Sequence, residues 1–215
     1  LGAQSTNREV LIRSGRGHTF KDIRDASELI TEHGFELGLQ MMIGLPGDNY
    51  DRSIQTANDL VSLGAGNTRI YPAIVVKHTV LEKLYREGKY TPLTLEQAVG
   101  WTKDIVHIFE KNNVSILRIG LHPSDELVIG KSLIDGPFHA SFKEMVMTQI
   151  WKEIINTELN DITSNKIKIT VSNRQLHYAI GYRQANKERL KSRGYHVHFE
   201  RNPSFSQYQI DVCDN

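Results

Sequence analysis

The sequence is poor in cysteine, with Cys213 the only one among its 215 residues. A single cysteine excludes an internal disulfide and any metal site with several cysteine ligands inside this chain. Long apolar runs are missing as well, and no signal peptide is visible at the start of the sequence, so we expect no membrane partner. A cytoplasmic location is the default expectation.

An excess of one sign of charge is also absent, because 26 Lys and Arg balance 25 Asp and Glu for a net charge of +1. No global attraction to nucleic acid follows, so any such attraction must be local. Residues 166–201 hold nine Lys or Arg and two Asp or Glu, about +7 on 36 residues. That segment is either an ordinary solvated surface or a phosphate-binding face.

What is present is typical of a globular α/β protein: 39% hydrophobic and 24% charged residues, with helical and strand-like patterns that alternate along the chain. Such alternation favours a parallel sheet with right-handed crossovers. The pattern changes near residues 158–165. We therefore predict one domain over residues 1–160 and a small α+β domain over residues 161–215.

The stretch from Phe35 to Gly47 is central to this interpretation. Alternate positions from Phe35 to Ile43 are apolar, and the positions between them form a second face that includes Gln40 and Met42. Gly-Leu-Pro-Gly at residues 44–47 then turns the chain toward a helix. Such turns lie at the carboxyl edge of a parallel sheet, where ligands bind. We expect a site there, with an ordinary core strand as the alternative.

Further polar residues are expected near this edge. The loop Gly-Arg-Gly-His at residues 15–18 leaves its arginine and histidine free to reach a ligand, although a solvated charge is the simpler interpretation for the arginine alone. Pro72 interrupts the strand predicted over 67–76 and brings the backbone there toward the edge. The histidines after the next strand lack metal-ligand spacing, and structural roles are equally compatible with them. The substrate-pocket candidates are His18, Tyr71, His122 and His139; no catalytic or metal-binding residue is assigned.

Three motifs in order resemble radical S-adenosylmethionine (SAM) enzymes: residues 1–5 (Leu-Gly-Ala-Gln-Ser), residues 15–18 and residues 44–47. Gln4 to Arg16 is twelve residues, and Arg16 to Gly44 is twenty-eight. The likeness covers about residues 1–150 and is strongest to the branch with the Elongator catalytic subunit, with oxygen-independent coproporphyrinogen oxidase more distant. It implies part of an incomplete (β/α)6 TIM-like barrel with SAM at the carboxyl ends of the strands.

The resemblance also implies roles for individual residues. Gln4 would contact the ribose of SAM, Arg16 its carboxylate, and Gln40 the ribose again. Met42 and the backbone at Pro72 would lie beside the adenine. The chemistry agrees, because a guanidinium suits a carboxylate and an amide both donates to and accepts from ribose hydroxyls.

In this family a reduced four-iron four-sulfur cluster cleaves SAM into methionine and a 5′-deoxyadenosyl radical. Three cysteines hold that cluster, and none of them is in this sequence. The first strands of the barrel are missing too. We therefore expect a portion of a longer enzyme, inactive alone, rather than a relic that has lost the chemistry. The exposed strand edges of such a half-barrel would favour homo-oligomers.

The segment 161–215 resembles a KH-type RNA-binding core in its strand–helix–loop–helix–strand order. Gly181 opens the loop where that family has Gly-x-x-Gly, and Gln184 takes the place of the second glycine. Arg183 and Lys187 would supply charge for a nucleotide backbone. These three positions, Gly181, Arg183 and Lys187, are the RNA-binding candidates.

Two functions of different classes follow. The first is a radical SAM enzyme that generates the 5′-deoxyadenosyl radical and acts on RNA such as tRNA. The second is a non-catalytic half-barrel scaffold that carries an RNA-binding module. A cysteine-rich loop encoded in frame ahead of Leu1 would favour the first. No spacing in the sequence identifies the substrate or the exact reaction.

Overall fold

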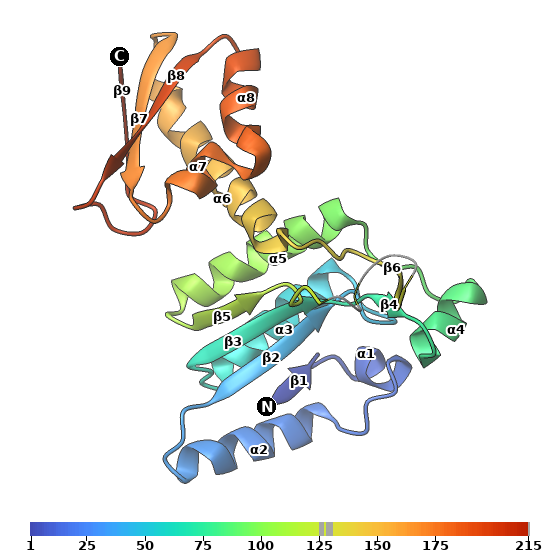
Figure 1. The fold of residues 1–215 in the computed structure, drawn as a ribbon. Coiled ribbons are helices and arrows are strands. Elements are labelled where there is room, and N and C mark those ends of the chain that lie inside the picture. The colour runs from blue at the N-terminus through green and yellow to red at the C-terminus, as the bar shows by residue number, and fades with distance from the viewer. Residues whose placement is uncertain (125–126, 128–130, 215) are drawn as a thin grey trace. The chain divides into compact units, whose positions relative to one another are not determined.

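The protein is described by a computed structural model that covers residues 1–124, 127 and 131–214 (Figure 1). The chain divides into two compact units, Leu1–Phe142 and Lys143–Asn215. We expected the boundary at 160/161, and the division lies earlier. The reason is helix α6 (Phe142–Glu158), whose Trp151 and Ile155 belong to the hydrophobic core of the second unit.

The first unit is built on a four-stranded parallel sheet with the strand order β1–β2–β3–β5. These strands are β1 (Gly2–Gln4), β2 (Gly38–Ile43), β3 (Asn67–Pro72) and β5 (Ser115–Ile119). A short antiparallel pair accompanies them, β4 (Val75–Val76) and β6 (Leu133–Asp135). The helices of the unit are α1 (Arg8–Arg13), α2 (Phe20–Glu32), α3 (Tyr50–Ser62), α4 (Val80–Arg86) and α5 (Leu95–Lys111). The predicted α/β class, parallel strands of a partial barrel followed by a small domain, is confirmed.

Side-chain caps fix where the helices begin. Thr19 and Asp22 form a capping box at the start of α2, and Thr94 and Gln97 form another at the start of α5. The side chain of Asn49 accepts the N–H of Arg52 at the start of α3. Each cap satisfies backbone donors that the first turn of a helix leaves open. Both capping boxes have the three-residue spacing of Thr and an acid or amide that can be read in the sequence.

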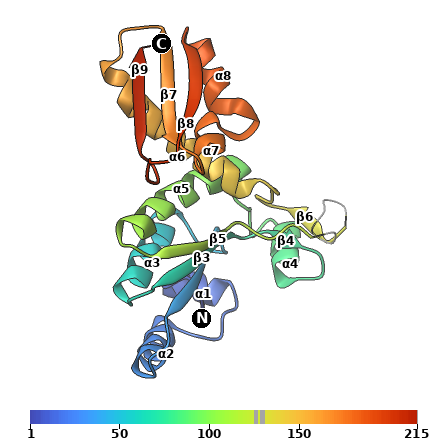
Figure 2. The same cartoon turned by 60° about the vertical axis from the view of Figure 1, so that its left-hand side comes forward.

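One face of the sheet is covered and the other is not. Helices α3 and α5 pack on each other and against β2 (Figure 2). Along β2 the buried positions alternate with half-buried ones, and Gln40 and Met42 lie on the half-buried face. The predicted two faces of this strand are therefore confirmed. In the described residues β1 and β5 form the edges of the sheet, so homo-oligomer formation through these edges stays a prediction.

Two strand boundaries in this unit lie at other residues than the sequence predicted. Strand β2 begins at Gly38 rather than at Phe35, whose side chain is 70% exposed. The N–H of Phe35 donates to the carbonyl of Ile30 and so ends α2 instead of joining the sheet. The strand expected over 67–76 is split after Pro72 into β3 and β4, as the proline predicted.

The second unit has a three-stranded sheet of order β8–β7–β9, with β7 and β8 parallel and β9 antiparallel to β7. Its elements after α6 are η1 (Leu159–Asp161), β7 (Lys166–Ser172), α7 (Leu176–Ile180), η2 (Tyr182–Gln184), α8 (Ala185–Ser192), β8 (His196–Asn202) and β9 (Ile210–Asp214). Helix α7 starts at Leu176, because the N–H of Gln175 first closes a turn on the carbonyl of Ser172. No helix in the described part of the chain is long and apolar enough to cross a membrane.

Candidate functional site

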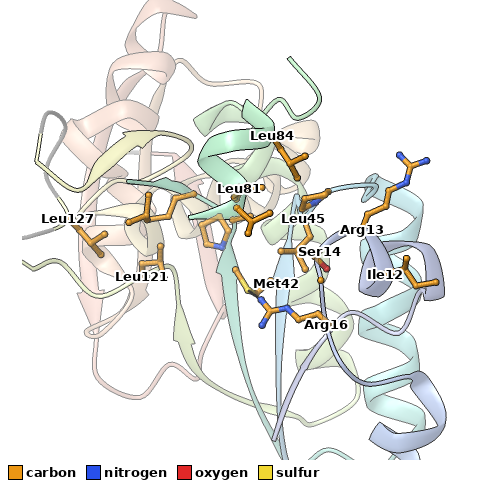
Figure 3. Close-up of a pocket in the computed structure, with 17 residues that line it drawn as sticks. Ile12, Arg13, Ser14, Arg16, Met42, Leu45, Leu81, Leu84, Leu121 and Leu127 are labelled. Carbon is orange, nitrogen blue, oxygen red and sulfur yellow. Dashed lines mark hydrogen bonds between the residues drawn. The ribbon is translucent and has the colours of Figure 1, made fainter. Parts of the chain in front are cut away.

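A cavity of about 590 Å³ opens at the carboxyl ends of β2 and β3, beside α1 and α4 (Figure 3). Its volume is that of a small-molecule site. Arg16, Met42 and Pro72, which the family resemblance places against SAM, all line it. Most of the remaining wall is apolar: Ile12, Leu45, Pro46, Ala73, Ile74, Val76, Val80, Leu81, Leu84, Leu121 and Leu127.

Arg16 is aimed at the strand face by a contact with sulfur. Its Nη2 lies 3.6 Å from Sδ of Met42, and Figure 3 shows the two side chains next to each other at the cavity wall. Arg16 is exposed and forms no ion pair within the described residues. A thioether is a weak acceptor. The guanidinium therefore keeps most of its donors available for an anionic group such as a carboxylate.

Gln4 and Gln40 meet beside this cavity rather than in its lining. Nε2 of Gln40 lies 3.4 Å from Oε1 of Gln4. Gln4 is buried and has a left-handed φ of 65°, a conformation that costs a non-glycine residue energy and often accompanies function. A Cβ on Gly2 would stand 2.6 Å from Nε2 of Gln4, so a larger residue there would displace this amide. The two amides form a polar pair on adjacent strands, as a ribose contact requires.

The Gly-Leu-Pro-Gly turn is braced from behind by a carboxylate and a phenol. Oδ2 of Asp48 accepts the N–H of Gly44 at 2.8 Å and the hydroxyl of Ser53 at 2.7 Å. The hydroxyl of Tyr90 donates to the carbonyl of Gly44 at 2.7 Å. Burial is the main cause that raises the pKa of Asp48, and burial followed by the charge of Asp48 raises the pKa of Tyr90. The brace holds Leu45 and Pro46 in the cavity wall.

The four substrate-pocket candidates are not gathered in the cavity. His18 is tied to β1, with Nε2 3.1 Å from the carbonyl oxygen of Ala3. Tyr71 is the lateral neighbour of Met42 on the open face. His122 is exposed and its Nδ1 lies 3.3 Å from Nη1 of Arg118, while Nδ1 of His139 accepts the N–H of Ser141. None of the four is among the lining residues, and whether they contact a substrate stays a prediction.

Sequence reasoning missed two parts of the site. Leu81 and Leu84 of α4 line the cavity, and α4 has no buried residue in its whole length. Both side chains are half-buried, and their place in the cavity wall depends on tertiary packing, so periodicity gave no signal for it. Arg69 and Arg118 share the open face with Gln40. The alternation of β3 could have placed Arg69 there.

In the second unit, the loop proposed for RNA contact is strongly left-handed. Gly181 has a φ of 89°, Arg183 of 50° and Gln184 of 61°. A Cβ on Gly181 would stand 2.9 Å from the backbone nitrogen of Asn186, so this glycine is required by close packing. Arg183 is exposed and its Cζ lies 5.3 Å from the Tyr182 ring centroid, whereas Lys187 is half-buried.

This unit also has a shallow hollow of about 500 Å³, lined by Lys191, Gly194, Tyr195, His196, Val197 and His198. Of the Lys and Arg residues counted in residues 166–201, only Lys191 lines this hollow, and binding of RNA there remains a prediction.

An iron–sulfur cluster does not fit the residues present. The single cysteine lies on β9 in the second unit, and in residues 1–124, 127 and 131–214 no group of three His, Cys, Asp or Glu side chains could hold a metal ion. Thiolates are the ligands such clusters require. No reaction step is therefore derived through a cluster in this chain.

Several known proteins resemble parts of this chain. Residues 67–152 match the family model described as the radical SAM C-terminal domain. An uncharacterised protein of Methanocaldococcus jannaschii is 33% identical over 106 residues, which is 49% of this chain and 33% of that protein. The tRNA uridine(34) acetyltransferase of Dehalococcoides mccartyi is 29% identical over 108 residues, covering 49% of this chain and 24% of the relative. Human Elongator complex protein 3 is 29% identical over 93 residues, which is 42% of this chain and 17% of that protein.

A solved structure has the same fold. The archaeal Elp3 of Methanocaldococcus infernus, with an N-terminal deletion, superposes with a TM-score of 0.61 at 22% identity, covering 71% of this chain and 35% of that one. At this identity the likeness concerns the fold alone. The matches thus span about a sixth to a third of the length of the relatives named here.

Proposed function

We propose that this chain, a radical SAM protein related to the Elongator catalytic subunit, binds SAM at the carboxyl edge of its parallel sheet. The observation that carries the proposal is the convergence of Arg16, Met42 and Pro72 on one cavity, with the Gln4–Gln40 pair on the adjoining strands. These residues come from β1, the loop at residues 15–18, β2 and β3, so a chance meeting at one edge is a weak explanation.

Each of these residues suits a different part of the SAM molecule. The exposed guanidinium of Arg16 binds the carboxylate, because charge-assisted bonds to a planar anion suit arginine. The amides of Gln4 and Gln40 contact the ribose hydroxyls. Met42 and Pro72 form an apolar wall for the adenine, and the braced turn at residues 44–47 keeps water out of it.

The complete reaction is proposed to be that of the family: a 5′-deoxyadenosyl radical, made when a cluster held outside these residues supplies an electron, acts on RNA such as tRNA. Two kinds of support exist. Relatives are named tRNA uridine(34) acetyltransferase, and residues 166–201 of the second unit hold nine Lys or Arg against two Asp or Glu. This chain contributes the positioning of SAM, and its membership of a tRNA-modifying enzyme is part of the proposal.

Binding of SAM to the full 215-residue chain tests the first claim. Isothermal titration calorimetry with SAM should show one site, and Arg16→Gln should weaken it about 10- to 100-fold, the value of one charged hydrogen bond. Arg24→Gln is the matched control, because Arg24 is a half-exposed arginine on α2 beside Asp25 and Glu28. Equal affinity of Arg16→Gln and the unchanged chain would refute the assignment.

A second function remains in view: a half-barrel scaffold with an RNA-binding module and no chemistry. The absence of cluster ligands in the described residues favours it. A chain that binds a tRNA transcript but shows no heat with SAM at millimolar concentration would support this alternative over the enzyme.

A further inference from the structure

Two arginines stand side by side on the open face of the first sheet. In the register of the parallel strands, Gln40 of β2 is level with Arg69 of β3, and Arg69 is level with Arg118 of β5. Both arginines are exposed, and they face away from α3 and α5. Adjacent strands are about 4.8 Å apart, so the two side chains leave the sheet from neighbouring points of this face and can reach one small ligand.

Within the part of the chain that the structure describes, no carboxylate lies within ion-pair distance of either guanidinium. The carboxylate of Glu36 near this face instead accepts a hydrogen bond from Nδ2 of Asn67 at 2.8 Å. The partner of Arg118 is an imidazole, with Nη1 3.3 Å from Nδ1 of His122. Like charges directly opposite each other on neighbouring strands destabilise a sheet.

Two adjacent arginines without a counter-charge among the described residues are explained by a ligand that brings the charge. We infer that Arg69 and Arg118 form an oxyanion subsite that holds a phosphate group of the substrate. Two guanidinium groups can each donate two parallel hydrogen bonds to one phosphate, which a single lysine or amide does not match. The oxygens of one phosphate suffice for both arginines.

The position gives the subsite its role. Through Gln40, the row of side chains leads directly from Arg69 to the amide pair proposed for the SAM ribose. A phosphate held by the arginines would fix one end of a substrate whose other end reaches the adenosyl group. This step rests on the proposed function for its meaning, although the anion site itself does not. The phosphate belongs either to an RNA backbone or to a small phosphorylated compound.

The test measures anion and SAM affinity on the same full-length variants. The probes are inorganic pyrophosphate, a short 5′-phosphorylated RNA, an unmodified tRNA transcript, and SAM. Arg69→Gln and Arg118→Gln should each lose tenfold or more in affinity for the phosphate probes and keep the affinity for SAM. Arg16→Gln should show the reverse, and Arg24→Gln should change neither.

A second readout separates a ligand site from a structural role. Removing one of two repelling charges should raise the melting midpoint without ligand by about 1–2 °C, while the stabilisation by pyrophosphate disappears. A structural arginine would instead lower the midpoint when replaced. Stabilisation that survives in both variants overturns the inference.

The remaining outcomes also decide between the claims. Failure of the unchanged chain to bind any phosphate probe overturns the subsite, and so does an equal loss of SAM affinity in Arg69→Gln. Absence of SAM binding with arginine-dependent phosphate binding refutes the proposed function and leaves the subsite standing. Tight binding of the RNAs alone assigns the phosphate to an RNA backbone, whereas equal binding of pyrophosphate assigns it to a small phosphorylated compound.

Discussion

The two units use their sheets in different ways. In the first, four parallel strands end at one edge, and the loops and strand faces there supply Arg16, Met42 and Gln40 to one place. In the second, a mixed three-stranded sheet has no common edge, and its candidate side chains lie along a loop and a helix. Parallel topology thus gathers side chains distant in sequence, whereas the mixed sheet presents residues that are already neighbours in sequence.

The largest expected effect comes from a substitution in the core of the second unit. Trp151 is fully buried in the second unit, and its Nε1 donates to Oε1 of Gln175 at 3.0 Å. We expect Trp151→Ala to cost the second unit about 3–5 kcal/mol of unfolding free energy and to abolish tRNA binding there. SAM affinity, measured by calorimetry, should be retained by the first unit.

The other tryptophan is the control. Trp101 on α5 is half-buried against Tyr50, and it reports on the first unit by fluorescence once Trp151 is gone. A urea titration followed at Trp101 should therefore stay close to that of the unchanged chain. If Trp151→Ala loses affinity for both SAM and tRNA, the two binding functions do not belong to separate units.

The brace behind the turn predicts a pH dependence in the first unit. Burial raises the pKa of Asp48 above 3.8, so the folded chain binds this proton at a higher pH than the unfolded chain. The stability that the group contributes is present below the unfolded pKa and is lost as pH rises through the folded pKa. The free energy of unfolding of Asp48→Asn, relative to that of the unchanged chain, should therefore rise from pH 4 to pH 7. The rise should be about 1.4 kcal/mol for each pH unit that separates the folded and unfolded pKa values of Asp48.

The control for Asp48→Asn is an acid whose pKa moves in the opposite direction. Hydrogen bonds from the Thr19 side chain and backbone lower the pKa of Asp22, so its contribution is present above the unfolded pKa and is lost as pH falls. Urea midpoints measured from pH 2.5 to pH 7 should show opposite trends for Asp48→Asn and Asp22→Asn. Parallel trends would contradict the role of the buried carboxylate.

The smallest expected effect concerns the loop of the second unit. Gln184 has a φ of 61°, which strains a residue with a Cβ, and glycine would relieve this. Gln184→Gly should stabilise the unit by about 0.5–1 kcal/mol after the entropy of the unfolded chain is counted, and it should raise tRNA affinity. Thermal melts and fluorescence anisotropy measure the two effects.

Asn113→Gly is the matched control for this loop, because Asn113 also has a left-handed φ, 57°, but lies after α5 in the first unit. It should stabilise the chain to a similar degree and leave tRNA affinity unchanged. An equal rise in tRNA affinity for both variants would separate the loop from RNA binding.

Much of the first unit could be predicted from local chemistry. The capping pairs at Thr19 and Thr94 fixed two helix starts, and Pro72 fixed the end of β3. The alternation along β2 placed Gln40 and Met42 on one face. The two compact units divide after Phe142 rather than at the predicted 160/161, because α6 belongs to the second core through side chains whose partners lie far along the chain.

The sequence alone determined that Gln40 and Met42 share one strand face, because the strand period fixes it, while the family resemblance added Gln4 and Arg16 to the same predicted site. Only the tertiary structure decided that His122 and His139 stay out of the cavity, that α4 forms its apolar wall, and that Arg69 and Arg118 are level with each other. The physical reason is range: caps and alternation act between residues a few positions apart, whereas lateral register and cavity walls depend on packing between segments that the chain brings together only when it folds.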